Sequence, residues 1–181
     1  MPRIAGRPNA NEYAPYYERY VSLVGGDDIE QILAAQGPES INLFSRFSEE
    51  KAEFRYAPGK WSVKEVIGHL TDSERVFAYR ALRIARADQT PIEGFEQDDY
   101  VKNGPFGQIS VAALIEEFAH VRSATTSLFR NLTGDEWSRR GVANKLEVTV
   151  RGLAYIIAGH ELHHRKIGRA IPGEISGEHV L

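Results

Sequence analysis

Four segments of the chain carry apolar residues at the three-and-four spacing of an amphipathic helix. The first expected helix begins at Asp28, which stands three residues before Gln31 as in a capping box, and its apolar face ends near Phe47. The other three helices are expected over residues 62–86, 110–129 and 149–168. No persuasive strand pattern occurs, and residues 146–150 are the only β-like run. The pattern therefore predicts an all-α protein.

Local signals sharpen two of these helices. Ser62 and Glu65 have the spacing of a capping box, and Trp61 directly before them can add a hydrophobic staple. We therefore assign these three residues to architecture rather than to chemistry. In the first helix, the pair Gly37 and Pro38 is expected to kink or split the helical pattern.

The segments between the helices are long. Residues 88–109 form an irregular connection of about 20 residues, too long for a tight antiparallel turn, so it is expected to cross the bundle and leave the second and third helices parallel. Its acidic side chains are expected to be solvated, although such a loop can cover a pocket. Residues 133–149 form a second long connection, and a short, tyrosine-rich helix is expected over residues 12–24.

The last helical segment carries histidines where leucines would be usual. Leu153 and Ile157 share one helix face with His160 and His164. This i, i+4 spacing lets two histidines of one helix bind the same metal. The alternative is that each imidazole is a hydrogen-bonded core residue. Two neutral imidazoles in a dry core would both need partners, and one shared cation supplies both.

A further ligand would have to come from upstream. Residues 160–164 also match the H-E-x-x-H string of zinc metalloproteases, but Ile167 and Ala170 stand where the extended motif needs glycine and histidine. His69 lies on a flank of the second helix. It is either an ordinary boundary histidine or, if the second and fourth helices are antiparallel, a neighbour of the histidine pair.

Composition narrows the classes of function and partner. The 181 residues, 42% of them hydrophobic, suit one domain, with an N-terminal arm and short helix over 1–27, a bundle over 28–168 and a tail over 169–181. The net charge of -3, without a basic block, disfavours nucleic acid as a partner. The absence of cysteine excludes disulfides, a cysteine nucleophile and a thiolate metal site.

The expected location is cytoplasmic. Residues 1–13 lack the apolar core of a signal peptide, and no apolar run approaches the roughly 20 residues of a membrane span. We therefore expect neither a membrane nor a nucleic acid as a partner.

Three stretches of the sequence, taken together, resemble the DinB-like (DinB/YfiT) superfamily. They are PGKWSVKEVIGHL at 58–70, DSERVFAYRALRIARAD at 72–88 and GHELHH at 159–164. Their order and spacing match, and the resemblance extends over nearly the whole chain. The tryptophan-to-histidine block and the C-terminal histidine helix are specific when they occur together.

This resemblance implies a four-helix bundle of up-down-down-up topology with a divalent metal bound by His69, His160 and His164. Three imidazoles leave an open coordination position, and they permit zinc, nickel or iron without selecting among them. Glu161 and His163 are then candidates for a catalytic base or for support of the ligands. Members of the superfamily often form homodimers, so a homodimer is expected here.

Three functions follow from this reading. The first is a thiol S-transferase that joins a low-molecular-weight thiol, such as bacillithiol or mycothiol, to a small electrophile. The second is a metal-dependent hydrolase that uses metal-bound water. The third is a bundle that binds a ligand or partner without turnover. The resemblance favours the first, and a small molecule is the expected substrate.

Overall fold

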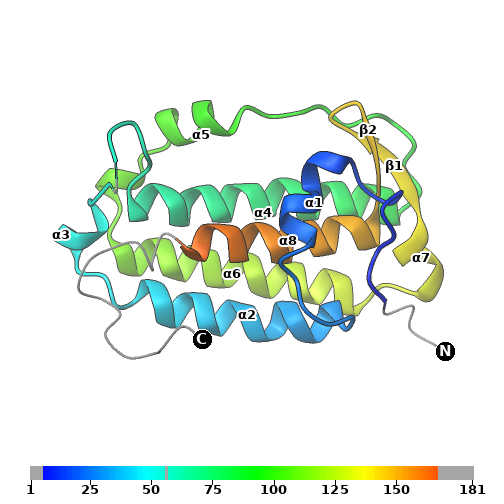
Figure 1. Cartoon of the computed structure of the whole chain (residues 1–181), viewed down its shortest axis with the longest axis horizontal. Helices are drawn as coiled ribbons and strands as arrows, with labels where there is room; N and C mark the ends of the chain where they lie inside the picture. The colour runs from blue at the N-terminus through cyan, green and yellow to red at the C-terminus, as the bar shows by residue number, and fades with distance from the viewer. Residues whose placement is uncertain (1–5, 56, 167–181) are drawn as a thin grey trace.

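The computed structural model describes residues 6–55 and 57–166 of the chain. Four long helices lie side by side as a bundle (Figure 1): α2 (Ile29–Phe44), α4 (Val63–Ala85), α6 (Val111–Arg130) and α8 (Val150–Arg165). Figure 1 shows α2 and α8 running in one direction and α4 and α6 in the other, an up-down-down-up order. Helices α2 and α4 each pack against both α6 and α8. This is the predicted all-α bundle.

Each long helix begins at the N-cap that the sequence predicts. A side-chain oxygen of the cap residue accepts a hydrogen bond from a backbone N–H in the first turn, which satisfies one otherwise unpaired donor. The caps are Asp28 for α2, Ser62 for α4, Ser110 for α6 and Thr149 for α8. At Ser62 the capping box is complete, because the Glu65 carboxylate also accepts from the Ser62 N–H at 2.7 Å.

Helix α2 does not split at Pro38, so of the two outcomes expected there, a kink or a split, the split is wrong. Pro38 lies inside one continuous helix. Leu33 and Phe44 on either side are fully buried, so packing holds the helix across the backbone hydrogen bond that proline cannot donate. The expected helix end at Gly168 and the tail over 169–181 lie outside the described residues.

Short elements occupy the connections. They are η1 (Pro15–Tyr17), α1 (Glu18–Val21), α3 (Glu49–Ala52), α5 (Gln97–Asn103), η2 (Phe106–Gln108) and α7 (Gly134–Ser138). The connection that contains α5 runs back along the bundle from the end of α4 to the start of α6, so these two helices are parallel as predicted (Figure 1). The short N-terminal helix is also present, although α1 is shorter than the sequence suggests.

A small β-hairpin before α8 was not predicted. Strands β1 (Arg140–Ala143) and β2 (Leu146–Thr149) pair antiparallel around a two-residue turn. Both turn residues, Asn144 and Lys145, have positive φ, at 51° and 65°, as a type I′ turn requires. Ile92 of the crossover connection pairs with the hairpin, because its N–H donates to Val142 O at 2.9 Å and its carbonyl accepts from Asn144 N at 2.8 Å.

The N-terminal segment packs its backbone directly on α8. A Cβ at Gly152 would lie 2.6 Å from the carbonyl oxygen of Glu12, and a Cβ at Gly159 would lie 2.0 Å from that of Tyr20. Only glycine allows both approaches. The two glycines are seven residues apart and so lie on the same side of the helix, which fixes α1 across α8 (Figure 1).

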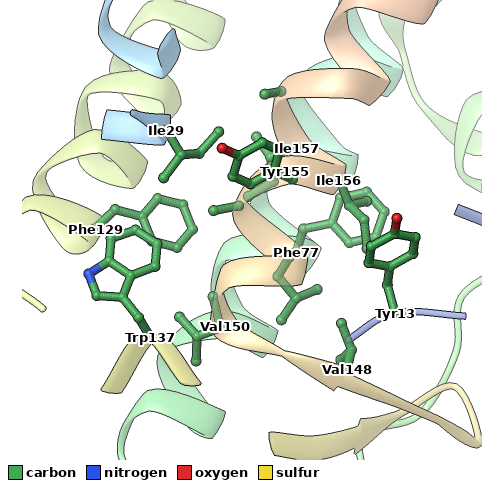
Figure 2. Packing of buried hydrophobic residues seen from close by; sticks show 14 of the residues in the cluster. Tyr13, Ile29, Phe77, Phe129, Trp137, Val148, Val150, Tyr155, Ile156 and Ile157 are labelled. Atoms are coloured by element: carbon green, nitrogen blue, oxygen red, sulfur yellow. The ribbon is translucent and has the colours of Figure 1, made fainter. Parts of the chain in front are cut away.

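The core consists of two hydrophobic clusters. One occupies the end of the bundle where α4 and α6 begin and includes Phe44, Ile67 and Phe118. The other surrounds Phe129 and Tyr155 at the opposite end, and Figure 2 shows its packing. The cluster around Phe129 and Tyr155 contains residues of all four long helices. The other cluster contains residues of α2, α4 and α6 and of the connections between them.

A layer of buried polar side chains separates the two clusters, and we call it the polar layer. Every long helix contributes to it: Gln36 and Ser40 from α2, His69, Ser73 and Glu74 from α4, Arg122 and Thr125 from α6, and His160 and Glu161 from α8.

No helix in the described part of the chain is long and apolar enough to cross a membrane.

Candidate metal centre

Three histidines meet at the edge of the polar layer, and we call them the histidine triad. His69 lies in the second turn of α4, whereas His160 and His164 lie in the last two turns of α8. Because these helices are antiparallel, the three rings converge. One ring nitrogen of each residue lies within 4.8 Å of the corresponding nitrogens of the other two. The Nε2 atoms of His69 and His160 are 3.0 Å apart.

This donor set fits a divalent metal. Nitrogens bound to a tetrahedral zinc ion at about 2.0–2.1 Å lie about 3.3–3.4 Å from one another. The closest pair here is 3.0 Å apart and all three nitrogens lie within 4.8 Å, so small side-chain movements would bring them to one metal. Burial lowers the pKa of His69 to about 4. Burial, with His69 and His163 nearby, lowers the pKa of His164 to about 3, and burial holds the pKa of His160 well below its usual value. All three rings are therefore neutral at pH 7, the state in which imidazole binds metal.

Neighbouring side chains hold the triad in place. The Oγ of Ser73 lies 3.3 Å from Nδ1 of His69, which leaves Nε2 of that ring to face His160. A second nitrogen held in this way is typical of histidines that bind metals. The Trp61 ring lies 4.6 Å from that of His69 and stacks on that of His164 at 6.1 Å, measured between ring centroids.

Two further aromatic rings enclose His160. The ring of Tyr20, from α1, meets it edge to face at 5.2 Å, and the ring of Phe77, from α4, does so at 5.9 Å. These walls limit the access of water to the triad and account for the low pKa of the buried ring.

Glu161 lies among structural partners rather than at the triad, and the catalytic role expected for it stays a prediction. Its carboxylate lies in the bundle interior, where one oxygen accepts from Ser40 Oγ and the other lies 2.6 Å from Nη1 of Arg122. Adjacent residues of a helix point about 100° apart, so Glu161 faces α2 and α6 while His160 faces α4. Both carboxylate oxygens are engaged in that network.

His163 is exposed and does not join the triad. Its ring lies 5.3 Å from that of Tyr20 and 5.1 Å from that of His164. From this position His163 can support the ring of His164 from the surface. A catalytic role for His163 stays a prediction. His120, on α6, is exposed as the sequence suggests.

Arg122 links all four long helices within the polar layer. From α6 its guanidinium donates two hydrogen bonds to Glu74 of α4, at 2.9 and 2.7 Å, and one at 3.4 Å to the Leu33 carbonyl of α2. It also forms the ion pair with Glu161 of α8. Burial alone would lower the pKa of Arg122, but Glu74 and Glu161 outweigh that effect and raise it. The guanidinium is thus charged and compensated.

A pocket of about 410 Å³ opens beside the triad. His160 and Ser73 form its inner wall, and Arg80 of α4 lines it farther along the helix. The N-terminal tyrosines, the crossover connection and the tip of the β-hairpin close its sides. Its volume lies in the range of sites that bind small molecules. The crossover connection therefore covers a pocket, as such a loop can.

Sequence reasoning missed several residues of this site. Trp61 was assigned to the helix start alone, and Tyr20 to packing. Glu74 and Arg122 stand in the apolar series of their helices, at i+4 from Leu70 and from Phe118, and that placement was a signal for buried charge. The pocket has no local signal, because its walls come from five separate parts of the chain.

A four-helix bundle with three converging histidines from two antiparallel helices defines the class of this protein. Sequence comparison then identifies the family, because the profile of the DinB superfamily matches residues 32–167. The chain belongs to the DinB superfamily. It is 24% identical over 128 residues to a protein of Oceanobacillus iheyensis named "Putative metal-dependent hydrolase OB0413", a match that covers 70% of this chain and 71% of that protein.

Two solved structures share the fold. YfiT from Bacillus subtilis, described as a probable metal-dependent hydrolase with an unusual four-helix bundle topology, has a TM-score of 0.65 at 15% identity and matches 90% of this chain and 89% of its own. The mycothiol-dependent maleylpyruvate isomerase has a TM-score of 0.66 at 11% identity. That match covers 81% of this chain but only 61% of the isomerase.

Proposed function

We propose that the histidine triad binds one divalent metal and that this protein is a metal-dependent enzyme. The observation that carries the proposal is the convergence of three neutral imidazoles, two buried and that of His164 half-buried, whose ligand nitrogens lie within 4.8 Å of one another. Three ligands leave a position for a reactant, as in catalytic rather than structural sites. The pocket beside His160 gives a small molecule room to reach that position.

We further propose that the reaction is the transfer of a low-molecular-weight thiol to a small electrophile. A divalent metal in the triad would deprotonate a bound thiol outright and would lower the pKa of a bound water to about 7. No carboxylate oxygen joins the triad in the described part of the chain, and Glu161 is engaged with Arg122. A thiol needs no such base, whereas attack by water usually relies on one.

The chain's own residues then position the reactants. Ser73 fixes the His69 ring, while Tyr20 and Phe77 keep bulk water from His160. The thiol sulfur attacks the electrophilic carbon, and a sulfur–carbon bond forms as the bond to the leaving group breaks. The leaving group takes the electron pair of that bond, and the thiol proton passes to solvent. The chain lacks cysteine, so the sulfur comes from an external thiol.

Hydrolysis is the second candidate. It is favoured by the names of two similar proteins, the Oceanobacillus iheyensis protein and YfiT, both described as metal-dependent hydrolases. Water would then replace the thiol as nucleophile, and the exposed Glu96, which lines the pocket, would be the candidate for proton transfer. The homodimer and the cytoplasmic location stay predictions.

Metal content tests the triad. Protein purified without a histidine tag is expected to hold about one transition metal per chain by elemental analysis. His69→Ala, His160→Ala and His164→Ala should each lower the affinity steeply, because two imidazoles bind a divalent cation far more weakly than three. His120→Ala, which removes an exposed histidine of α6, is the matched control. Equal metal content in all four variants would contradict the proposal.

Turnover separates the two reactions. Metal-loaded and metal-stripped protein are incubated with monochlorobimane and a panel of cellular thiols, and separately with ester and amide probes without thiol. We expect conjugation that depends on both metal and thiol. Metal-dependent hydrolysis without thiol would select the second candidate. Identical behaviour of loaded and stripped protein in both panels would leave a bundle that binds without turnover.

A further inference from the structure

Arg80 is a buried cation in the wall of the pocket. Its residue is only 3% exposed, and the pocket that it lines also contains His160 of the triad. Nη2 donates to the Glu93 carbonyl oxygen at 3.0 Å, and the hydroxyl of Tyr17 lies beside the guanidinium. Nε is buried without a hydrogen-bond partner.

No carboxylate pairs with Arg80 among the residues that the structure describes. Arg122, equally buried one helix away, has two carboxylates against its guanidinium. The guanidinium of Arg80 instead lies 5.7 Å from the ring centroid of Phe77 and 5.8 Å from that of Phe95. Aromatic faces attract a cation but do not neutralise it. A buried charge without a counter-charge is costly, so its place in a pocket points to a ligand.

We propose that this pocket binds a small organic molecule that bears a carboxylate, with Arg80 holding the carboxylate and the aromatic side chains packing on the molecule's apolar body. A planar guanidinium matches a carboxylate through two parallel hydrogen bonds. One unpaired cation balances a single negative charge, whereas a phosphate dianion would leave excess negative charge near Glu96 in the same wall.

The position of Arg80 along α4 sets the length of the ligand. Ser73, beside the triad, and Arg80 are seven residues apart, which is about 10 Å along a helix axis. A ligand of about this length whose carboxylate is bound at Arg80 would therefore have its other end at His160. This last step rests on the proposed function, because it assumes that the reaction occurs at the triad. The carboxylate belongs to either the electrophile or the thiol.

Calorimetric titration of the full chain with phenylacetate and with its neutral analogue phenylacetamide tests the binding. We expect at least about tenfold tighter binding of the carboxylate, because charge-assisted hydrogen bonds are much stronger than neutral ones. Arg80→Met, which keeps the side-chain volume and removes the charge, should abolish the preference. Arg75→Gln is the matched control, since Arg75 lies exposed on the same helix and pairs with Glu117.

The titration is repeated on metal-stripped protein, because a carboxylate can also bind a metal directly. A preference that survives stripping and vanishes in Arg80→Met supports the proposal. A preference that vanishes on stripping, that persists in Arg80→Met, or that is absent from the wild type overturns it. The wild-type comparison needs no variant, so misfolding of Arg80→Met would not prevent a decision.

These outcomes are separate from those of the proposed function. If the triad holds no metal but the carboxylate preference depends on Arg80, the proposed enzyme fails while this binding site stands. If metal binds and the preference is absent, the reverse holds.

Conjugation assays identify which reactant carries the carboxylate. One arm compares 3-mercaptopropionate with 2-mercaptoethanol on monochlorobimane. The other compares 4-(chloromethyl)benzoate with 4-(chloromethyl)benzamide using 2-mercaptoethanol. We expect Arg80→Met to raise KM for the carboxylate-bearing reactant in one arm and to leave its neutral analogue unchanged. An equal change for charged and neutral reactants in both arms would overturn the assignment to Arg80.

Discussion

Trp61 stands between the start of α4 and the histidine triad. Its neighbour Ser62 caps the helix, and its own ring packs on the hydrophobic cluster at that end of the bundle. The same ring also lies against His69 and His164. The start of α4 therefore also contributes to the site. It determines where His69 lies along the bundle axis, and the Trp61 ring covers one side of the His69 ring. Among the described residues, the hydrogen bonds of Ser62 are those of the helix start.

Replacement of the cap alone is expected to affect stability and not the triad. Ser62→Ala removes the oxygen that accepts from Glu65 N at 3.2 Å and leaves a part-buried amide without that partner. The free energy of unfolding should fall by about 0.5–2 kcal/mol, measured by urea denaturation of the metal-stripped protein. Metal affinity of the folded variant should stay at the wild-type value. A variant of unchanged stability with weaker metal binding would show that Ser62 acts on the site.

At the scale of elements, the N-terminal segment is tied to α8 through Glu12. Its backbone carbonyl accepts from Thr149 N at 3.0 Å, one carboxylate oxygen accepts from Thr149 Oγ1 at 2.9 Å, and Arg151 donates to the carboxylate as well. Burial alone would raise the pKa of Glu12, but hydrogen bonds from Arg151, Asn9 and Thr149 outweigh it and lower the pKa below 4.5. The same contacts place α1, and with it Tyr20, beside His160.

A pH dependence of stability follows from Glu12. Because its pKa is lower in the folded than in the unfolded chain, its contribution is fully present above about pH 4.5 and is lost as pH falls through the folded value. Glu12→Gln should therefore lower the free energy of unfolding by about 1–3 kcal/mol at pH 7, and the difference from wild type should shrink below pH 4.5. Urea denaturation at pH 7, 5 and 3.5 measures it. A difference that stays constant with pH would contradict the assignment.

Elements with strong local signals were predictable, and those fixed by distant contacts were not. The long helices carry caps and apolar stripes within their own residues, so α4 was predicted to begin at Ser62 and α8 at Thr149. The β-hairpin has strands of four residues and turns at Asn144 and Lys145 instead of the usual asparagine-glycine pair, so its signal is weak. The continuity of α2 through Pro38 depends on tertiary packing, which a local rule does not include.

The same distinction holds for the site. The i, i+4 pair of α8 is a local pattern, and it brought His160 and His164 to attention. His69 required the relative direction of two helices, which came from the resemblance to a known superfamily. The orientation of Glu161 required its partner Arg122, 39 positions earlier in the chain and on another helix. The sequence pattern and the resemblance together therefore found the three candidate metal ligands, but not the partner of Glu161.

In the whole molecule, the polar layer determines where chemistry is possible. Hydrophobic clusters close both ends of the bundle, and the layer between them holds the triad on one side and the Arg122 network on the other. Arg122 is 5% exposed and Glu161 is 1% exposed, so their charges have little access to water. The network fixes the rotation of α8 about its axis, because Glu161 must face Arg122, and the adjacent His160 is thereby directed toward α4. The residues that hold the bundle together and the residues of the triad therefore lie in the same turn of α8.

Loss of Arg122 is expected to destabilise the whole bundle. Arg122→Met removes the cation and leaves Glu74 and Glu161 as buried, uncompensated carboxylates, so the free energy of unfolding should fall by about 3–5 kcal/mol. Arg75→Gln is the matched control. The ion pair of Arg75 with Glu117 joins α4 and α6 at the surface, where such a pair contributes at most about 1 kcal/mol.

A compensated variant separates the charge imbalance from the loss of packing. Arg122→Met combined with Glu74→Leu and Glu161→Met replaces the whole network by apolar side chains and should recover most of the lost stability, since no buried charge is then left without a partner. Chemical denaturation of the metal-stripped proteins compares the wild type with all three variants. If the combined variant is no more stable than Arg122→Met, the network holds the helices through its specific geometry rather than through charge balance. Metal affinity of the combined variant then reports whether the facing of α8, and with it the position of His160, depends on the same contacts.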